Sequence, residues 1–325
     1  MEKGALVLEG GSLRGMFTAG VLDVLMENGI WMEYVNGVSA GSMCGYNYIS
    51  RQPGRTRQID ETFCSDRKFM GLRNLLRSGD VFNFDYLFGE ISGTLCPADR
   101  ETFSASPQIF EAVATDCLTG RERYFRKGEM PLETFELACR ASSSMPTLSR
   151  TVEIDGVPYL DGGCACPIAY HRAMELGYEK VAAVLTRPAG YRKKPQVGRG
   201  TTAAERRLYA RKYPRLFEAL QEANRRYNAM YTELERMERE GRIFLLRPEG
   251  PVLVSRLERS ADKLEVLYQQ GRSVCTRRLE ELKRYLELRR RALGLDELDL
   301  YDLYVPMVDE VDFDMPFDKA CALVK

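Results

Sequence analysis

The first fifty residues alternate between two spacings of apolar side chains. Residues 5–8 form a short apolar run followed by glycines, which predicts a buried strand. Over residues 16–28 the apolar positions recur at helical spacing, and Gly29 stands where a helix-ending glycine is expected. A second strand is predicted at 34–38 and a second helix at 40–49. This order of elements is typical of a parallel sheet flanked by helices.

The next part of the chain predicts strands of a different kind. Apolar runs and helical spacing indicate a strand pair at 110–115 and 123–125, a helix at 132–141 and a buried strand at 181–185. Residues 152–159 predict a hairpin, because its Asp-Gly turn tolerates positive φ angles. Pro158 has no N–H to donate, so its arm is expected at the edge of the sheet. Residues 51–100 are rich in aromatic side chains, and our interpretation is that they cover the active face.

The composition changes after residue 187. Residues 187–226 hold twelve lysines and arginines against three glutamates, whereas residues 295–325 hold nine acidic residues and two lysines. Two long helices are predicted at 202–240 and 255–292, and the apolar run 243–246 between them predicts a strand that returns to the sheet.

These patterns together predict a three-layer α/β fold, in which helices flank a mainly parallel sheet. We expect one α/β domain over residues 1–250. Its motif-bearing part would lie at 5–187, and a helical insertion at about 197–240. A helical extension with an acidic tail would follow at 251–325.

Charge and cysteine content exclude several classes of protein. The chain has 47 basic and 47 acidic residues, so no overall field attracts nucleic acid and no such partner is expected. Nine cysteines, an odd number without framework spacing, indicate free thiols and a cytoplasmic protein. No run of eighteen apolar residues occurs, so neither a transmembrane helix nor a signal peptide is expected.

The strongest chemical motif is Gly37-Val38-Ser39-Ala40-Gly41, a G-x-S-x-G between a predicted strand and a predicted helix. A serine on such a sharp turn is exposed at the top of a sheet, and the glycines relieve crowding around it. The helix that follows points its positive end at a developing oxyanion. The pentapeptide is short, and its alternative interpretation is an ordinary glycine-rich turn.

A second glycine-rich loop, residues 9–15, also lies between a predicted strand and a predicted helix. Its backbone N–H groups can converge on an anion. A Walker A loop is excluded because Met16 and Phe17 follow the last glycine, and a dinucleotide fingerprint is excluded because Gly10, Gly11 and Gly15 have the wrong spacing. The loop is therefore suited to an oxyanion hole, with phosphate cradling by a non-standard loop as an alternative.

A third motif, Asp161-Gly162-Gly163, follows the predicted hairpin. In isolation it is more often a plain turn than a catalytic carboxylate. Its position after the other two motifs favours the interpretation as a catalytic carboxylate.

Together the three motifs resemble the patatin-like phospholipase family, over roughly residues 5–187. That family is similar in its oxyanion loop, its G-x-S-x-G elbow and an Asp-Gly-Gly aspartate that completes a Ser-Asp dyad without histidine. The small residues of 140–146 also resemble the family's segment ahead of the aspartate. Two positions depart from the family pattern: Ser12 replaces the usual third glycine, and Glu9 replaces the commoner aspartate.

The resemblance implies a mechanism and its residues. Ser39 would be the nucleophile and Asp161 the base, with Gly10, Gly11 and Arg14 in the oxyanion loop and Gly37 and Gly41 at the elbow. The substrate would be an acyl ester or phospholipid, hydrolysed through an acyl-enzyme, and no metal or cofactor is expected. For Asp161 to act as a base, its pKa must not be strongly depressed. The basic segment 187–226 could make peripheral contact with a membrane.

Three alternatives stay open from the sequence. The order Ser39, Asp161, His171 is that of an α/β-hydrolase triad, but only one strand precedes the elbow. A patatin-like fold could also bind lipid or phosphate without turnover. Cys164 and Cys166 lie near His171, the only histidine, but fall short of the four ligands of a structural zinc site.

Overall fold

The computed structural model describes residues 1–194 and 203–287, and one eight-stranded sheet organises them. The strand order is β5-β6-β3-β2-β1-β7-β8, with β4 paired to β3. The strands are β1 (Glu2–Leu8), β2 (Met32–Val38), β3 (Ile109–Asp116), β4 (Glu122–Arg126), β5 (Val152–Ile154), β6 (Val157–Asp161), β7 (Val181–Val184) and β8 (Phe244–Leu246). The pairs from β3 through β2, β1 and β7 to β8 are parallel, whereas β4, β5 and β6 pair antiparallel. The mainly parallel sheet expected from the sequence is therefore confirmed.

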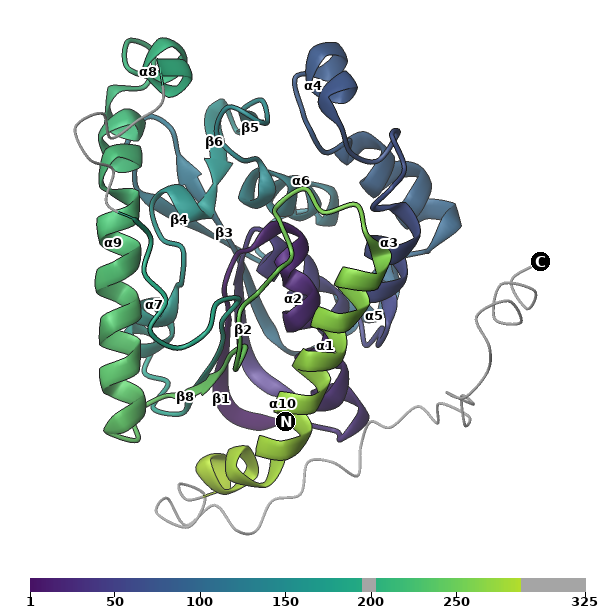
Figure 1. Ribbon diagram of the computed structural model, residues 1–325, viewed down its shortest axis with the longest axis vertical. Helices are drawn as coiled ribbons and strands as arrows, with labels where there is room; N and C mark the ends of the chain where they lie inside the picture. Colours follow the sequence, from purple (N-terminus) through teal and green to yellow (C-terminus); the bar gives the residue numbers. More distant parts are fainter. Residues whose placement is uncertain (195–202, 288–325) are drawn as a thin grey trace.

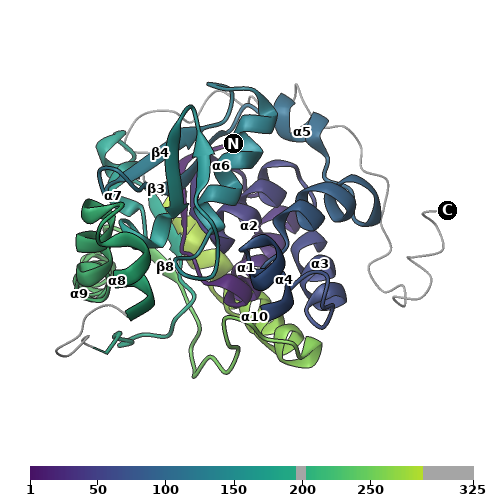
Figure 2. The same ribbon diagram turned by 90° about the horizontal axis from the view of Figure 1, so that it is seen from above.

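Helices cover both faces of this sheet (Figure 1). They are α1 (Gly15–Glu27), α2 (Ala40–Ile49), α3 (Arg55–Phe63), α4 (Leu72–Ser78), α5 (Arg100–Ala105), α6 (Leu132–Ser143), α7 (Tyr170–Glu175), α8 (Ala203–Tyr209), α9 (Pro214–Arg239) and α10 (Ala261–Glu287). Short 3₁₀ turns occur at η1 (Ser12–Arg14) and η3 (Gly162–Cys164), and η2 (Tyr86–Leu95) is a π-helix. Seen from above, α9 and α10 lie on opposite sides of the molecule (Figure 2).

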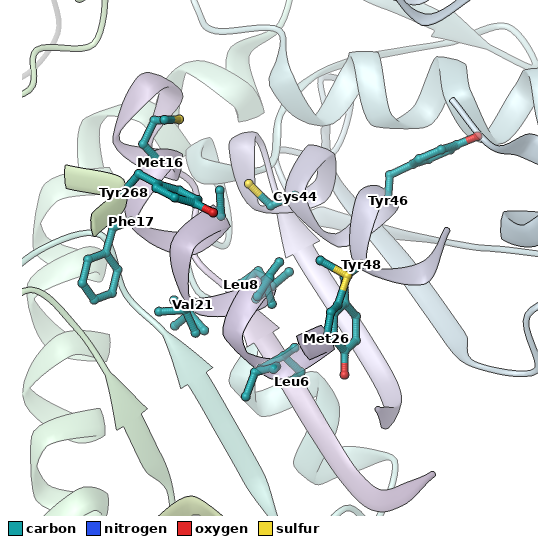
Figure 3. Packing of buried hydrophobic residues seen from close by; sticks show 14 of the residues in the cluster. Leu6, Leu8, Met16, Phe17, Val21, Met26, Cys44, Tyr46, Tyr48 and Tyr268 are labelled. Atoms are coloured by element: carbon teal, nitrogen blue, oxygen red, sulfur yellow. The ribbon is translucent and has the colours of Figure 1, made fainter. Parts of the chain in front are cut away.

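The alternation of side chains along β1 builds the two cores. Leu6 and Leu8 face the larger core, where side chains from α1, α2 and α10 pack on them (Figure 3). Ala5 and Val7 point to the opposite face and pack in a second cluster with residues of α7 and α9. Successive strand residues point to opposite faces, so a strand between two helical layers is apolar at every position. This explains the continuous apolar run seen in the sequence.

Helices α1 and α10 are in close backbone contact. A Cβ at Gly20 would lie 2.1 Å from the carbonyl oxygen of Tyr268, and one at Gly271 would lie 2.1 Å from that of Phe17. The Tyr268 hydroxyl also donates a 2.7 Å hydrogen bond to Asp23. The helix α10 therefore belongs to the same packed unit as the sheet, and the glycines permit the crossing.

Most predicted elements coincide with observed ones, including the 152–159 hairpin, whose turn residues Asp155 and Gly156 have φ angles of 51° and 76°. The edge position predicted for the Pro158 arm is wrong, because β6 lies between β5 and β3. Pro158 is tolerated since the β3 ladder ends at Asp116–Tyr159, next to it. The acidic tail and the end of the second long helix lie outside the described residues. In the part that the structure describes, no helix is both long and apolar enough to cross a membrane.

Candidate active site

Ser39 stands on a strained turn between β2 and α2. Its φ and ψ angles are 55° and −124°, a conformation that non-glycine residues rarely adopt and that functional sites often retain. The flanking glycines make the turn possible. A Cβ at Gly37 would lie 2.5 Å from the Gly41 carbonyl oxygen, and one at Gly41 would lie 2.4 Å from that of Leu8. The G-x-S-x-G sequence therefore folds as a tight strand-to-helix elbow.

A buried serine fixes the backbone of this elbow. The Ser39 N–H donates to the Ser142 hydroxyl at 2.8 Å, and that hydroxyl donates to the Val113 carbonyl oxygen at 2.5 Å. Ser142 is at the end of α6, in the small-residue segment singled out from the sequence. The segment thus connects the elbow to β3.

Asp161 ends β6 and lies beside Ser39. The hydroxyl of Ser39 is hydrogen-bonded to its carboxylate, and the Gly163 N–H donates to the same carboxylate at 2.7 Å. A Cβ at Gly162 would lie 2.2 Å from the Val113 carbonyl oxygen, so the glycine after Asp161 allows this close approach to β3. The structure brings Ser39 and Asp161 together, as the sequence motifs predicted.

Burial raises the pKa of Asp161. The hydrogen bonds from Ser39 and Gly163, and the more distant charges of Arg256 and Lys193, act in the opposite direction without reversing the shift. A carboxylate that is costly to keep ionised is a better proton acceptor than a solvated one.

The glycine loop lies against the elbow. A Cβ at Gly10 would be 3.0 Å from the Ser39 Cβ. Within the described ranges, the N–H groups of Gly10 and Gly11 donate no hydrogen bond. The N–H of Arg14 is engaged, since it donates to the Gly11 carbonyl oxygen at 3.2 Å. Ser12, at the usual glycine position, has a φ of 52°, which explains why glycine is the common residue there.

The side chain of Glu9 anchors the start of this loop. Its two carboxylate oxygens accept hydrogen bonds from the Thr186 N–H at 2.6 Å and from the Tyr227 hydroxyl at 2.8 Å. Glu9 is buried, and burial raises its pKa. Glu9, which stands where the family commonly has aspartate, thus connects the loop to α9 and to Thr186, two residues after the end of β7.

Two cavities of different character meet at Ser39. The smaller, of about 120 Å³, has largely apolar walls that include Met43, Phe69, Phe82, Phe84 and Leu87. The larger, of about 570 Å³, is also lined by Asp161 and by the glycine loop. Several residues of 51–100 thus line the space beside the serine, as our interpretation of that region proposed.

The larger cavity is lined by several cations, most of which belong to no sequence motif. Arg14, Arg187, Lys193 and Arg256 all contribute to its wall. Only Arg14 was named as a site residue, and Arg187 and Lys193 were part of the basic segment as a whole. Arg256 belongs to no sequence motif. The loop before α10 brings it to the cavity, so its position there follows only from the fold.

His171 lies elsewhere. It is half-exposed on α7, its ring contacts that of Tyr170, and its Nε2 is 3.7 Å from Glu233 of α9. It lines neither cavity, so the geometry gives no support to the triad. Tyr209 and Tyr213 of the basic segment are buried, and so is Tyr227 directly after it. Cys164 and Cys166 are buried free thiols, and no cluster of three or more metal-ligating side chains occurs within residues 1–194 and 203–287.

Two sequence models of protein families match parts of the chain. The sequence model described as patatin-like phospholipase matches residues 6–171, about half of the chain. A second model, described as a domain of unknown function (DUF6363), matches residues 213–287.

Individual relatives cover part of the chain. It is 30% identical over 197 residues to the protein YjjU of Escherichia coli K12, covering 59% of this chain and 54% of that one. It is 30% identical over 171 residues to the NTE family protein Mb1092c of Mycobacterium bovis, covering 50% and 43%. The chain therefore spans about half the length of these curated relatives. The structure of VipD from Legionella pneumophila aligns with a TM-score of 0.44 at 12% identity, over 86% of this chain and 67% of that one. From the match over residues 6–171, the chain belongs to the patatin-like phospholipase family.

Proposed function

We propose that this protein is a serine hydrolase of acyl esters that uses Ser39 and Asp161 as a dyad. The observation that carries the proposal is the position of the strained Ser39 beside the buried Asp161 carboxylate, at the wall of one cavity. A nucleophile is activated when a base accepts its proton within hydrogen-bond reach. Asp161 meets this condition, and its raised pKa suits it to hold the proton during the reaction.

The reaction follows from these positions. The Ser39 Oγ attacks the ester carbonyl carbon while its proton passes to Asp161, and the carbonyl oxygen takes up negative charge beside the Gly10 and Gly11 amides. When the tetrahedral intermediate collapses, Asp161 returns the proton to the leaving alkoxide. Water then attacks the acyl-enzyme, gives its proton to Asp161 and releases the acid, and the proton passes back to Ser39.

The two cavities are suited to different parts of the ester substrate. The apolar cavity suits the acyl chain, because burial of methylene groups is favourable by about 0.8 kcal/mol each. The larger cavity, with its polar walls, receives the alcohol side of the ester.

Covalent labelling tests the proposal. A fluorophosphonate should add to the wild-type protein at Ser39, as read by intact mass and peptide mapping. Ser39→Ala should remain unlabelled, whereas Ser65→Ala, at an exposed position outside both cavities, should be labelled like the wild type. A wild-type protein that is folded yet unlabelled would instead favour a binding module without turnover.

The same proposal includes peripheral contact with an anionic membrane through the basic segment 187–226. Arg206 and Arg207 are exposed on α8 beside Leu208, which is 50% exposed. At the same end of the molecule, α4 exposes Leu72 and Leu76 (Figure 1). Basic and apolar side chains together favour an anionic lipid surface. Binding to phosphatidylglycerol vesicles should exceed binding to phosphatidylcholine vesicles and should fall when Arg206 and Arg207 are replaced by glutamine.

A further inference from the structure

The apolar cavity beside the nucleophile also has polar side chains in its wall, and most of these are paired. Arg55 donates to the Asn47 Oδ1 at 2.7 Å and to the Ser92 hydroxyl at 2.9 Å. The Tyr46 hydroxyl donates to Glu136 at 3.0 Å. Among the residues that the structure describes, two polar side chains of this wall have no hydrogen bond or ion pair. These two groups are free to contact a ligand.

Asp60 is the first of the two. It lies in the interior of α3, and Thr56 and Ile59 of the preceding turn line the same cavity. Burial raises its pKa to about 7, and no described group of opposite charge offsets the cost of its ionisation. Aspartate is also a poor helix former in a helix interior, so the helix itself does not explain the residue. A carboxylate in such a wall indicates a ligand that donates a hydrogen bond to it.

Ser143 is the second. Its side chain is 8% exposed, and its buried hydroxyl has no partner in the part of the chain that the structure describes. It directly follows Ser142, whose hydroxyl accepts the Ser39 N–H at 2.8 Å. Ser143 therefore belongs to the end of the cavity at the nucleophile, where it can contact the first atoms of the acyl chain.

Asp60 lies further along the cavity. Burial and the nearby charge of Asp60 raise the pKa of the Cys44 thiol, which places the carboxylate close to Cys44. Cys44 is on α2, which begins directly after Ser39, and the two residues are about 7.5 Å apart along the helix axis at 1.5 Å per residue. A group on the acyl chain that reaches Asp60 is therefore several atoms away from the carbonyl carbon that Ser39 attacks.

The surroundings of Asp60 favour a neutral donor over a cation. The walls of the cavity are largely apolar, and a hydroxyl group costs much less to transfer into such walls than an ammonium group does. The guanidinium of Arg55 lines the same cavity and would repel a second positive charge. A hydroxyl group on the acyl chain is therefore the donor that fits.

We infer that Asp60 selects acyl chains that carry a hydroxyl group away from the ester carbonyl, by accepting a hydrogen bond from that hydroxyl in the cavity beside Ser39. The inference rests on the proposed function and specifies the acyl part of its substrate. An unsubstituted chain would leave the Asp60 carboxylate desolvated and unpaired, so the site discriminates against it. A cavity of 150 Å³ can hold benzene, so one of about 120 Å³ has room for a chain of about six carbons.

Two methyl esters of equal size test the role of Asp60. Methyl 6-hydroxyhexanoate ends in a hydroxyl group, and methyl heptanoate has a methyl group in its place. The wild-type kcat/KM should be at least about tenfold higher for the hydroxy ester, the equivalent of one hydrogen bond to a charged group. Asp60→Leu should lower kcat/KM for the hydroxy ester and raise it for the heptanoate, whereas general damage to the protein would lower both. A wild-type ratio of one or less, or an unchanged ratio in Asp60→Leu, would overturn the inference.

Two further variants and a third ester complete this experiment. Asp262→Leu, at an exposed position on α10, should keep the wild-type ratio. Asp60→Asn retains an acceptor oxygen and should give a ratio between those of the wild type and Asp60→Leu. Methyl 6-aminohexanoate, which is a cation at pH 7, should be a poorer substrate than the hydroxy ester. If it is the better one, the group recognised is an ammonium and the inference is wrong.

A second measurement does not depend on turnover. At equal concentration, methyl 6-hydroxyhexanoate should raise the Tm of the Ser39→Ala protein more than methyl heptanoate does. Asp60→Leu in that background should remove the difference. Equal Tm shifts with both esters would overturn the role of Asp60. A difference in Tm shift without hydrolysis of any ester by the wild type would contradict only the proposed function.

Discussion

The hydroxyl of Tyr227 on α9 donates a 2.8 Å hydrogen bond to Glu9, the residue that opens the glycine loop. Two parts of the chain that match different family models are thereby joined at the loop that lies against Ser39. The contact connects the helical region to the glycine loop, because the Glu9 backbone leads into Gly10 and Gly11.

Tyr227→Phe should weaken this connection. Glu9 would lose one of its two partners in a buried position, which costs about 1–3 kcal/mol of unfolding free energy. Ester hydrolysis should fall as well, because the glycine loop loses its support. Urea denaturation measures the first effect and initial rates the second. Tyr191→Phe is the matched control, since its ring packs on Tyr227 but its hydroxyl has no described hydrogen bond. Equal losses in both variants would argue against a role for the Glu9 contact.

Gly41→Ala should disrupt the elbow. The new methyl group would lie 2.4 Å from the Leu8 carbonyl oxygen, a backbone atom that cannot move alone. Overpacking of this kind costs about 3 kcal/mol, and the shift in Ser39 should lower activity further. Gly250→Ala is the control, because nothing lies within 4 Å of its Cβ position. Retained stability and activity in Gly41→Ala would show that the elbow is looser than described.

The fold was largely predictable from apolar spacing, but the site only in part. Runs such as residues 5–8 and 34–38 indicated strands because both faces of the central sheet are covered. The motifs located Ser39, Asp161 and Gly10, since short spacings in strand-turn-helix units determine local geometry. Lys193 and Arg256 could not be located this way, because a distant helix and a loop bring them to the cavity. The position of Pro158 was missed because a proline next to the end of a ladder needs no edge.

Asp161→Asn should abolish ester hydrolysis without lowering the free energy of unfolding. Burial raises the pKa of Asp161 above its usual 3.8, so its ionised form costs folding free energy at neutral pH, and that cost disappears as the pH falls through the raised pKa. The neutral asparagine avoids the cost and can still accept from the Gly163 N–H. At pH 7 the variant should therefore be as stable as the wild type or more so, by urea denaturation. A clearly less stable variant would contradict the assigned shift.

Hydrolysis of a p-nitrophenyl acyl ester by four proteins tests the central claim most directly. Ser39→Ala and Asp161→Asn should each lower kcat by about 10³-fold or more, the scale seen when a nucleophile or its base is removed. His171→Ala, outside both cavities, should stay within about twofold of the wild type. A folded His171→Ala protein as inactive as Ser39→Ala, or an Asp161→Asn protein that retains its rate, would contradict the dyad.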